Sequence, residues 1–176
     1  MTRKLTGEQV ERALDQLYES IGTALPSDRR IAVVGIRTWG ETLAARIVAK
    51  LKEQKSLEVD HGVLDITFYR DDLSRRRGAP LVRATEIDFD LDGAWVLLVD
   101  DVLQTGRSVR AALDALHDFG RAAVIRLAVL IDRGGRELPI SADFVGRKVR
   151  APAGSRIQVT LRENDGEEGV FILPRN

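Results

Sequence analysis

Apolar positions near the start of the chain recur with the period of an α-helix. Val10, Leu14, Leu17 and Ile21 are separated by four, three and four residues, which places them along one side of a helix. The positions between them are mostly polar or charged. The pattern predicts an amphipathic helix over about residues 7–24 that ends before Pro26.

Three later runs are predominantly apolar and rich in β-branched residues. Residues 31–36, 95–100 and 124–131 have the composition of strands that are covered on both faces. Apolar residues at helical spacing follow the first two runs: Leu43, Ile47 and Leu51, and then Val109, Leu113 and Leu116. The second of these helices is expected to end at Gly120. Alternating strands and helices predict a mostly parallel sheet with helices on both faces.

The other segments predict smaller elements. Residues 63–69 alternate with a period near two, which predicts a strand. Residues 70–80 are dense in charge and end in Gly and Pro, which predicts a mobile loop. Short strands over about 143–172 should form a small hood at the sheet's edge. The predicted fold class is α/β: a mostly parallel central sheet flanked by helices, with a hood, in a single domain over residues 1–176.

Composition narrows the possible function classes. The 176 residues include no cysteine, which excludes disulfides, thiolate zinc sites and a cysteine nucleophile, and suits a reducing cytoplasm. No apolar run could span a bilayer, so we expect no membrane insertion. Lys plus Arg and Asp plus Glu both number 27, so no overall basic excess attracts nucleic acid.

The segment over residues 99–108 combines acids, small residues and hydroxyls between a predicted strand and a predicted helix. Ligands of open α/β sheets collect at the carboxyl ends of strands. Asp100 and Asp101 can accept hydrogen bonds from the vicinal hydroxyls of a ribose. Thr105, Gly106 and Ser108 can offer hydroxyls and backbone N–H groups to a phosphate at a helix N-terminus. The segment therefore predicts a site for a phosphorylated ribose.

The same segment permits other interpretations. Two aspartates before a helix can simply cap it. The Leu-Val-Asp-Asp string also occurs in receiver domains, but there it lies near the N-terminus and is not followed by a Thr-Gly-Arg-Ser loop. A Walker loop requires Gly-Lys followed by Ser or Thr, which this segment lacks.

The full string resembles the phosphoribosyl diphosphate (PRPP) signature of type I phosphoribosyltransferases. Three further segments resemble the bifunctional pyrimidine operon regulators: a diphosphate loop at 34–40, a flexible active-site loop at 65–74, and the stretch 130–140 after the last core strand. The resemblance implies a type I phosphoribosyltransferase fold, and an enzyme that makes UMP and diphosphate from uracil and PRPP with Mg²⁺. It also implies binding of leader RNA and a dimer or higher oligomer.

The resemblance assigns candidate site residues. The catalytic candidates are Asp100, Asp101 and Arg70. The PRPP loop adds Val102, Leu103, Gln104, Thr105, Gly106, Arg107 and Ser108, and the diphosphate loop comprises Arg37, Thr38, Trp39 and Gly40. Weaker candidates for the nucleotide or base are Arg83, Arg133, Arg136 and Ile157. No direct protein ligand to Mg²⁺ is expected, because the ion is held through PRPP near the two aspartates.

Some positions depart from the family or have a plainer interpretation. Trp39 replaces a usual basic residue, which could weaken diphosphate contact, Gln104 a usual tyrosine, and Gly135 a usual histidine. Arg75, Arg76 and Arg77 could close over the site or form a solvated charge run. His61 and His117 lie outside the motifs and are expected in surface or packing roles.

Leader-RNA binding is expected to be weak or absent. Glu8, Glu11, Asp15 and Glu19 form a row opposite the apolar face of the first helix, and this row would repel phosphates. The opposing signal is a possible basic patch of Arg133, Arg136, Arg147, Lys148 and Arg150. Two alternatives therefore remain open beside the enzyme: an RNA-binding attenuator that senses uridine nucleotides with little catalysis, and a phosphoribosyltransferase for another base.

Overall fold

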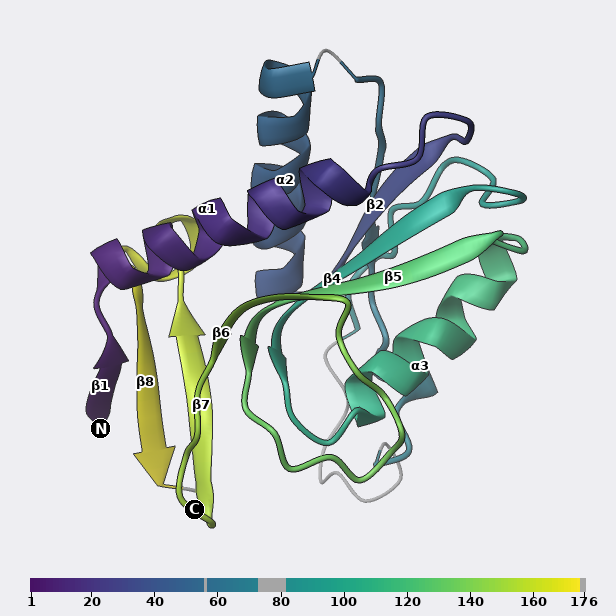
Figure 1. Cartoon of the computed structure of the whole chain (residues 1–176). Helices are drawn as coiled ribbons and strands as arrows, with labels where there is room; N and C mark the ends of the chain where they lie inside the picture. Colours follow the sequence, from purple (N-terminus) through teal and green to yellow (C-terminus); the bar gives the residue numbers. More distant parts are fainter. Residues whose placement is uncertain (56, 73–81, 175–176) are drawn as a thin grey trace.

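The computed structural model describes residues 1–55, 57–72 and 82–174 of the chain (Figure 1). Within these ranges, five parallel strands form a central sheet in the order β3-β2-β4-β5-β6. The strands are β2 (Ile31–Ile36), β3 (Asp60–Leu64), β4 (Trp95–Leu103), β5 (Val124–Asp132) and β6 (Phe144–Lys148). None of the described helices combines the length and apolarity needed to cross a bilayer.

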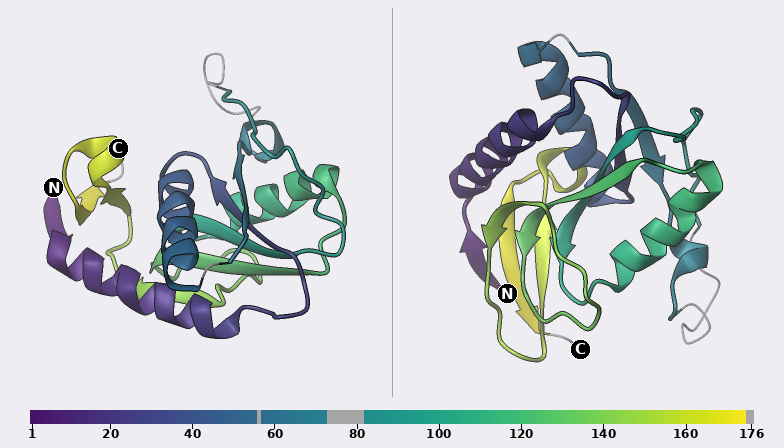
Figure 2. Two further views of the ribbon diagram at one scale, coloured as in Figure 1. Left: turned by 90° about the horizontal axis from the view of Figure 1, so that it is seen from above. Right: turned by 45° about the vertical axis from the view of Figure 1, so that its right-hand side comes forward.

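Helices cover both faces of this sheet, as the alternating pattern predicted. The helices α1 (Gly7–Ala24) and α2 (Trp39–Lys55) pack on one face, and α3 (Arg107–Leu116) packs on the other (Figures 1 and 2). All six residues of β2 are buried, because alternate side chains enter the two opposite layers. Helix α1 begins at a capping box, in which the Thr6 hydroxyl accepts from the Gln9 N–H and the Gln9 side chain accepts from the Thr6 N–H.

A second, antiparallel sheet forms the hood, which we define as β1 (Thr2–Leu5), β7 (Ser155–Thr160), α4 (Arg162–Asp165) and β8 (Gly169–Pro174). Its strand order is β1-β8-β7. In Figure 2 the hood stands beside the N-terminal end of α1, on the side of the molecule away from α3. Val159, Leu161 and Val170 continue the core that lies under α1 and α2. The hood is therefore packed against the same layer that carries the diphosphate loop.

The predicted strand over residues 63–69 was wrong in its bounds. Strand β3 begins at Asp60 and ends at Leu64. The carboxylate of Asp65 accepts a hydrogen bond of 2.6 Å from the N–H of Thr67, and this local bond turns the chain into a 3₁₀ helix over Thr67–Tyr69. The alternating pattern therefore spans a strand end and a turn.

Two further differences concern the hood. The segment over residues 143–172 was expected to lie wholly in it, but β6 joins the central sheet beside β5, where Val145 pairs with Val129. Strand β1 was not predicted, because three of its four residues are exposed and only Leu5 is buried. The predicted loop over residues 70–80 is described only up to Asp72, so Arg75, Arg76 and Arg77 lie outside the described residues.

Two glycines allow the start of α2 to lie against the end of the sheet. A Cβ added to Gly35 would stand 2.5 Å from the carbonyl oxygen of Gly40, and one added to Gly40 would stand 2.4 Å from the carbonyl oxygen of Val99. Both distances are far shorter than any real contact of a Cβ atom. Glycine is therefore required at both positions, and this packing sets the first turn of α2 beside the carboxyl end of β4.

Replacing Gly35 by alanine should destabilise the fold by about 1–3 kcal/mol, because backbone atoms would have to move to admit the methyl group. Urea unfolding measures the change. Gly22→Ala is the matched control, since a Cβ there would meet only the flexible end of Lys55, at 3.4 Å, and alanine favours the helix. Equal stability of Gly35→Ala and the wild type would contradict the close packing.

Candidate active site

The candidate residues of the sequence meet at the carboxyl edge of the central sheet. Two adjoining cavities of about 780 and 450 Å³ open there. They share Arg70, Asp100, Asp101, Val102 and Ser108. The larger cavity extends along the PRPP loop, and the smaller one extends to the diphosphate loop after β2 and to the turn after β3. We call the two together the cleft.

The acid pair lies at the end of β4, where the strand leaves the core. Asp100 is only 8% exposed, and its Oδ1 accepts a hydrogen bond of 2.9 Å from the N–H of Asp101. Burial raises the pKa of both carboxyls, and the nearby charge of Asp101 raises the pKa of Asp100 further. Two acids held together in this way favour a partner that donates hydrogen bonds or carries positive charge.

The PRPP loop turns sharply between β4 and α3. Gly106 precedes the helix with φ of +91°, a conformation that side chains other than glycine rarely adopt. The Thr105 hydroxyl accepts from the N–H of Arg107 at 3.3 Å, and the Thr105 carbonyl accepts from the N–H groups of Glu137 and Leu138. The segment after β5 therefore holds the loop through backbone hydrogen bonds, and the start of α3 faces the cleft.

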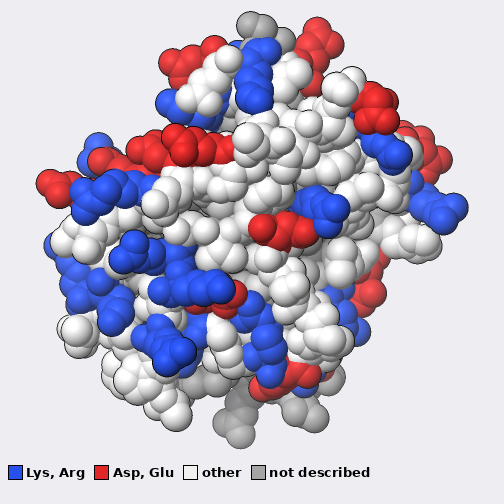
Figure 3. All heavy atoms as spheres, in the orientation of Figure 1, with Lys and Arg blue, Asp and Glu red and all other residues white. Residues whose placement is uncertain are grey.

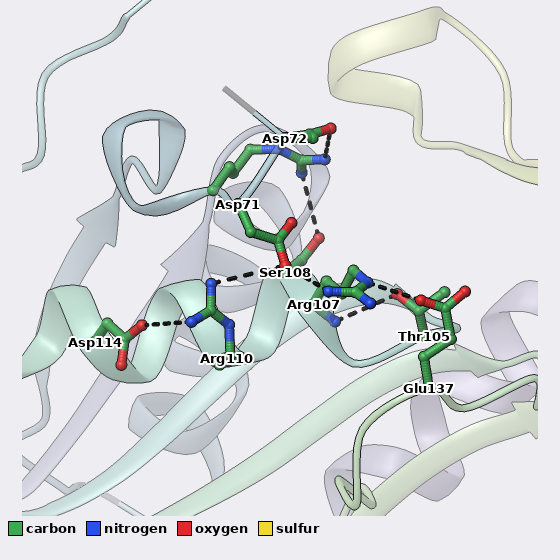
Figure 4. A network of polar contacts seen from close by, with 9 residues as sticks. Asp71, Asp72, Thr105, Arg107, Ser108, Arg110, Asp114 and Glu137 are labelled. Atoms are coloured by element: carbon green, nitrogen blue, oxygen red, sulfur yellow. Dashed lines mark hydrogen bonds and ion pairs between the residues drawn. The ribbon is translucent and has the colours of Figure 1, made fainter. Parts of the chain in front are cut away.

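Charged side chains surround the start of α3 (Figure 4). Arg107 lies between two carboxylates: its Nη1 is 2.6 Å from Asp71 and its Nε is 2.7 Å from Glu137. Asp71 also lies 3.8 Å from Arg110. Sequence patterns did not predict Asp71 or Glu137 as site residues. The one signal for Asp71 was its position beside Arg70 in the active-site loop.

Arg70, the third catalytic candidate, reaches the cleft from the segment after the 3₁₀ helix. Its guanidinium binds the Asp72 carboxylate through two hydrogen bonds, of 2.9 and 3.0 Å. A longer contact of 3.5 Å joins its Nη1 to the Ser108 hydroxyl. The charge of Arg70 is thus close to the start of α3 and partly offset by Asp72.

The diphosphate loop lies between β2 and α2. Arg37 is bound on three sides: Nε donates to the Ala84 carbonyl, Nη1 contacts Glu41 at 3.0 Å and Nη2 contacts Glu86 at 2.6 Å. Thr38 and Trp39 line the cleft, and the peptide bond between Arg37 and Thr38 is cis. The charge of Arg37 is therefore offset, and the groups of this loop that remain for a ligand are the Thr38 hydroxyl and backbone N–H groups.

The weaker candidates divide into two pairs. Arg83 lines the smaller cavity and donates to the Thr38 hydroxyl at 3.4 Å, while Ile157 of the hood lines the larger cavity.

Arg133 and Arg136 are bound elsewhere. The Arg133 guanidinium donates to the carbonyls of Ser155 and Pro152, and Arg136 contacts Asp132 at 2.8 Å and the carbonyls of Gln104 and Ile140. Among the described residues that line the cleft, neither appears. Arg133 ties the hood to β5, and Arg136 supports the PRPP loop.

Comparison with known proteins identifies the family of this chain. Residues 4–158 match the family model of the phosphoribosyl transferase domain. A bifunctional protein PyrR of Roseiflexus sp. (strain RS-1) is 54% identical over 170 residues, which cover 96% of this chain and 93% of the relative. The PyrR of Chloroflexus aurantiacus is 50% identical over 169 residues, with 96% and 93% covered. The hypoxanthine phosphoribosyltransferase of Trypanosoma cruzi superposes with a TM-score of 0.69 at 16% identity, over 100% of this chain and 98% of that one, which supports the fold.

The fold is that of a type I phosphoribosyltransferase. Within this class, the chain belongs to the family of the bifunctional PyrR proteins, regulators with uracil phosphoribosyltransferase activity. The fold and family expected from the sequence are thereby confirmed.

Gly106→Ala should weaken PRPP binding by about tenfold, because a left-handed conformation costs a non-glycine residue roughly 1–2 kcal/mol. The added Cβ would also press on Ile140 at 3.3 Å. Isothermal titration with PRPP measures the affinity.

Gly154→Ala is the matched control, since its φ is +71°, its Cβ would meet nothing within 4 Å, and it lies outside the cleft. Unchanged PRPP affinity in Gly106→Ala would mean that the loop does not bind the phosphate as assigned.

Proposed function

We propose that the cleft transfers the phosphoribosyl group of PRPP to uracil, giving UMP and diphosphate, and that Asp100 and Asp101 hold the ribose during this step. The observation that carries the proposal is the position of the acid pair, between the PRPP loop and the diphosphate loop at one edge of the sheet. This spacing suits a ligand with a phosphate at one end, a ribose in the middle and a diphosphate beside it.

The acid pair supplies the electrostatic part of the reaction. The bond between the anomeric carbon and the diphosphate breaks with its electron pair going to diphosphate, so positive charge develops on the sugar. A ring nitrogen of uracil then bonds to that carbon and releases its proton to water. Asp100 and Asp101 accept hydrogen bonds from the ribose hydroxyls and stabilise the developing charge. Correct placement of the two reactants supplies much of the remaining rate enhancement, so no protein nucleophile is needed.

The two ends of the cleft bind the charged ends of PRPP. The hydroxyls of Thr105 and Ser108 and the start of α3 receive the terminal phosphate. Thr38 and the backbone at the start of α2 receive the diphosphate, with Arg83 beside them. Arg70 moves from Asp72 to the incoming phosphate charge, since a doubly charged oxyanion attracts a guanidinium more strongly than one carboxylate does.

Mg²⁺ fits the chemistry of this cleft. Among the described residues, no cluster of three or more His, Asp or Glu side chains could hold a metal ion. Burial makes it costly to keep Asp100 and Asp101 ionised, which is why their pKa values are raised, and a nearby Mg²⁺ held through PRPP would offset that cost. Bound together with PRPP near these aspartates, the ion would offset the negative charge of the diphosphate.

Asp100→Asn and Asp101→Asn should each lower kcat/KM, because each removes a charge-assisted hydrogen bond to the ribose. The loss should correspond to roughly 2–4 kcal/mol of transition-state stabilisation. Their melting temperatures should equal or exceed that of the wild type. A folded-state pKa raised by burial means that the ionised acid opposes folding at neutral pH, and asparagine removes that cost. UMP formation and thermal unfolding measure the two effects.

Unchanged kinetics in both variants would contradict the ribose assignment. Competition of orotate and purine bases against uracil decides between uracil and another base. If a different base suppresses UMP formation and is itself converted, the transferase assignment stands and the base is corrected.

Membership of the PyrR family raises the question of whether this chain binds RNA. Two charged surfaces, one acidic and one basic, affect the answer. Figure 3 shows acidic side chains along α1 and basic side chains below them, over the hood and β6. Glu8, Glu11, Asp15 and Glu19 are all exposed on α1, and the exposed basic residues beside this helix include Arg147, Lys148 and Arg150. Arg133 and Arg136 are engaged internally and do not extend this basic surface. We therefore infer that leader RNA binds weakly, because the acidic row borders the basic surface.

Replacing Asp15 and Glu19 by lysine should increase RNA affinity, most strongly at low salt, because phosphate contacts dominate such binding. A gel shift with the pyrimidine leader of the source organism, in the presence of UMP, measures it. The double variant Glu53→Lys with Glu58→Lys is the control. It changes the net charge by the same amount, but in the last turn of α2 and just after it, away from the acidic row of α1. Tight, sequence-selective binding by the wild type would contradict the prediction.

The assembly and location of the chain are also proposals. The resemblance to the operon regulators supports a dimer or a higher oligomer, and the absence of cysteine supports a reducing cytoplasm. Light scattering across a range of protein concentrations measures the oligomeric order.

A further inference from the structure

A row of polar contacts joins the hood to α2. The contacts come from residues 39, 42 and 46 of α2, whose spacing of three and four places them on one face of the helix. Their partners are consecutive residues of α4. The contacts are Trp39 Nε1 to Asp165 Oδ2 at 3.0 Å, Thr42 Oγ1 to Asn164 Oδ1 at 2.7 Å, and Arg46 Nη2 to Glu163 Oε2 at 2.5 Å.

The first of these contacts differs from the others because Trp39 belongs to the diphosphate loop. Trp39 is the first residue of α2 and lines the cleft, while its indole N–H reaches out to the hood. The receiving oxygen of Asp165 also accepts a hydrogen bond of 2.9 Å from the N–H of Leu161. The carboxylate is thereby fixed to the backbone of the hood, and the indole ties the diphosphate loop to it.

The opposite side of the same loop is fixed by backbone contact. Gly35 and Gly40 pack so closely against each other and against Val99 that neither could carry a side chain. The loop is therefore held between the end of β4 on one side and the hood on the other. Of these two supports, only the contact of Trp39 with Asp165 is made by side chains, so it can be removed without changing the backbone packing.

We infer that Asp165 is a positioning residue for diphosphate, which acts through the indole of Trp39; the inference rests on the proposed function of the cleft. Arg37 is bound to Glu41 and Glu86, and position 39 carries no positive charge. The loop must therefore bind diphosphate largely through the Thr38 hydroxyl and backbone N–H groups. Such hydrogen bonds weaken steeply when their direction is wrong, so the orientation of the loop controls their strength.

Trp39→Phe and Asp165→Ala test this role from the two ends of the contact. Phenylalanine removes the N–H donor and keeps an aromatic ring, and alanine removes the acceptor and keeps the indole. Each variant should bind Mg²⁺-diphosphate about three- to tenfold more weakly in isothermal titration, the loss expected when one ordinary hydrogen bond is removed. The KM for PRPP should rise by a similar factor, while the KM for uracil stays near the wild-type value. The melting temperature should stay near that of the wild type in Trp39→Phe and fall slightly in Asp165→Ala, which also loses the acceptor of the Leu161 N–H.

Two further variants separate positioning from general docking of the hood. Thr42→Val removes the neighbouring contact to Asn164 and leaves the diphosphate loop untouched, so its diphosphate affinity should equal that of the wild type. Asp165→Asn retains an oxygen acceptor and should restore most of the affinity that Asp165→Ala loses. The double variant Trp39→Phe with Asp165→Ala should bind no more weakly than Asp165→Ala alone, because both changes remove one interaction.

Wild-type diphosphate affinity in both Trp39→Phe and Asp165→Ala would overturn the inference. An equal loss in Thr42→Val would also overturn it, since the effect would then belong to docking of the hood. If Trp39→Phe fails to fold, Asp165→Ala and Asp165→Asn decide the question. A wild-type protein that binds diphosphate but makes no UMP from uracil would contradict the proposed function, and the titrations would still test the role of Asp165.

Discussion

The close approach between the first turn of α2 and the end of β4 is the constraint on which the cleft depends. It exists because Gly35 and Gly40 leave no side chain between the helix and the strand. The contact brings the diphosphate loop beside Asp100 and Asp101, although these segments are separated by about sixty residues of sequence. A bulkier residue at either glycine would move the loop away from the acids, even if every residue with a chemical role were retained.

Charge in the cleft is arranged in pairs. Arg37, Arg70 and Arg107 each contact at least one carboxylate of the protein, at distances between 2.6 and 3.0 Å. These carboxylates satisfy the guanidinium groups, which would otherwise face an anionic ligand or water alone. A phosphorylated ligand must therefore compete with the protein's own carboxylates for these arginines. Breaking the internal ion pairs costs free energy and reduces the net attraction for the ligand. The hydroxyls of Thr38, Thr105 and Ser108 also line the cleft, and the strength of their hydrogen bonds depends on geometry.

Sequence patterns predicted strands β2, β4 and β5 and the turn between β4 and α3 close to their observed positions, because these elements depend on short-range signals. The buried runs of β2 and β4 and the helical spacing around Leu14 are such signals, and the structure has these elements close to the expected positions. The turn at Asp65 was missed, since one carboxylate hydrogen bond ended a pattern that still alternated. Arg133 and Arg136 were placed at the nucleotide by resemblance, and their partners in the hood and the PRPP loop depend on contacts that no local pattern contains.

The hood is built from both ends of the sequence, and this has a consequence for the order of folding. Strand β1 pairs with β8, and Arg3 binds Glu167 across a sequence separation of 164 residues. During synthesis the central strands emerge before β8 and can pair with one another, whereas β1 must wait for almost the whole chain. The sheet and the acid pair can therefore form on the ribosome before the cleft is covered. The hood, whose Ile157 lines the larger cavity, is completed only after β8 has emerged.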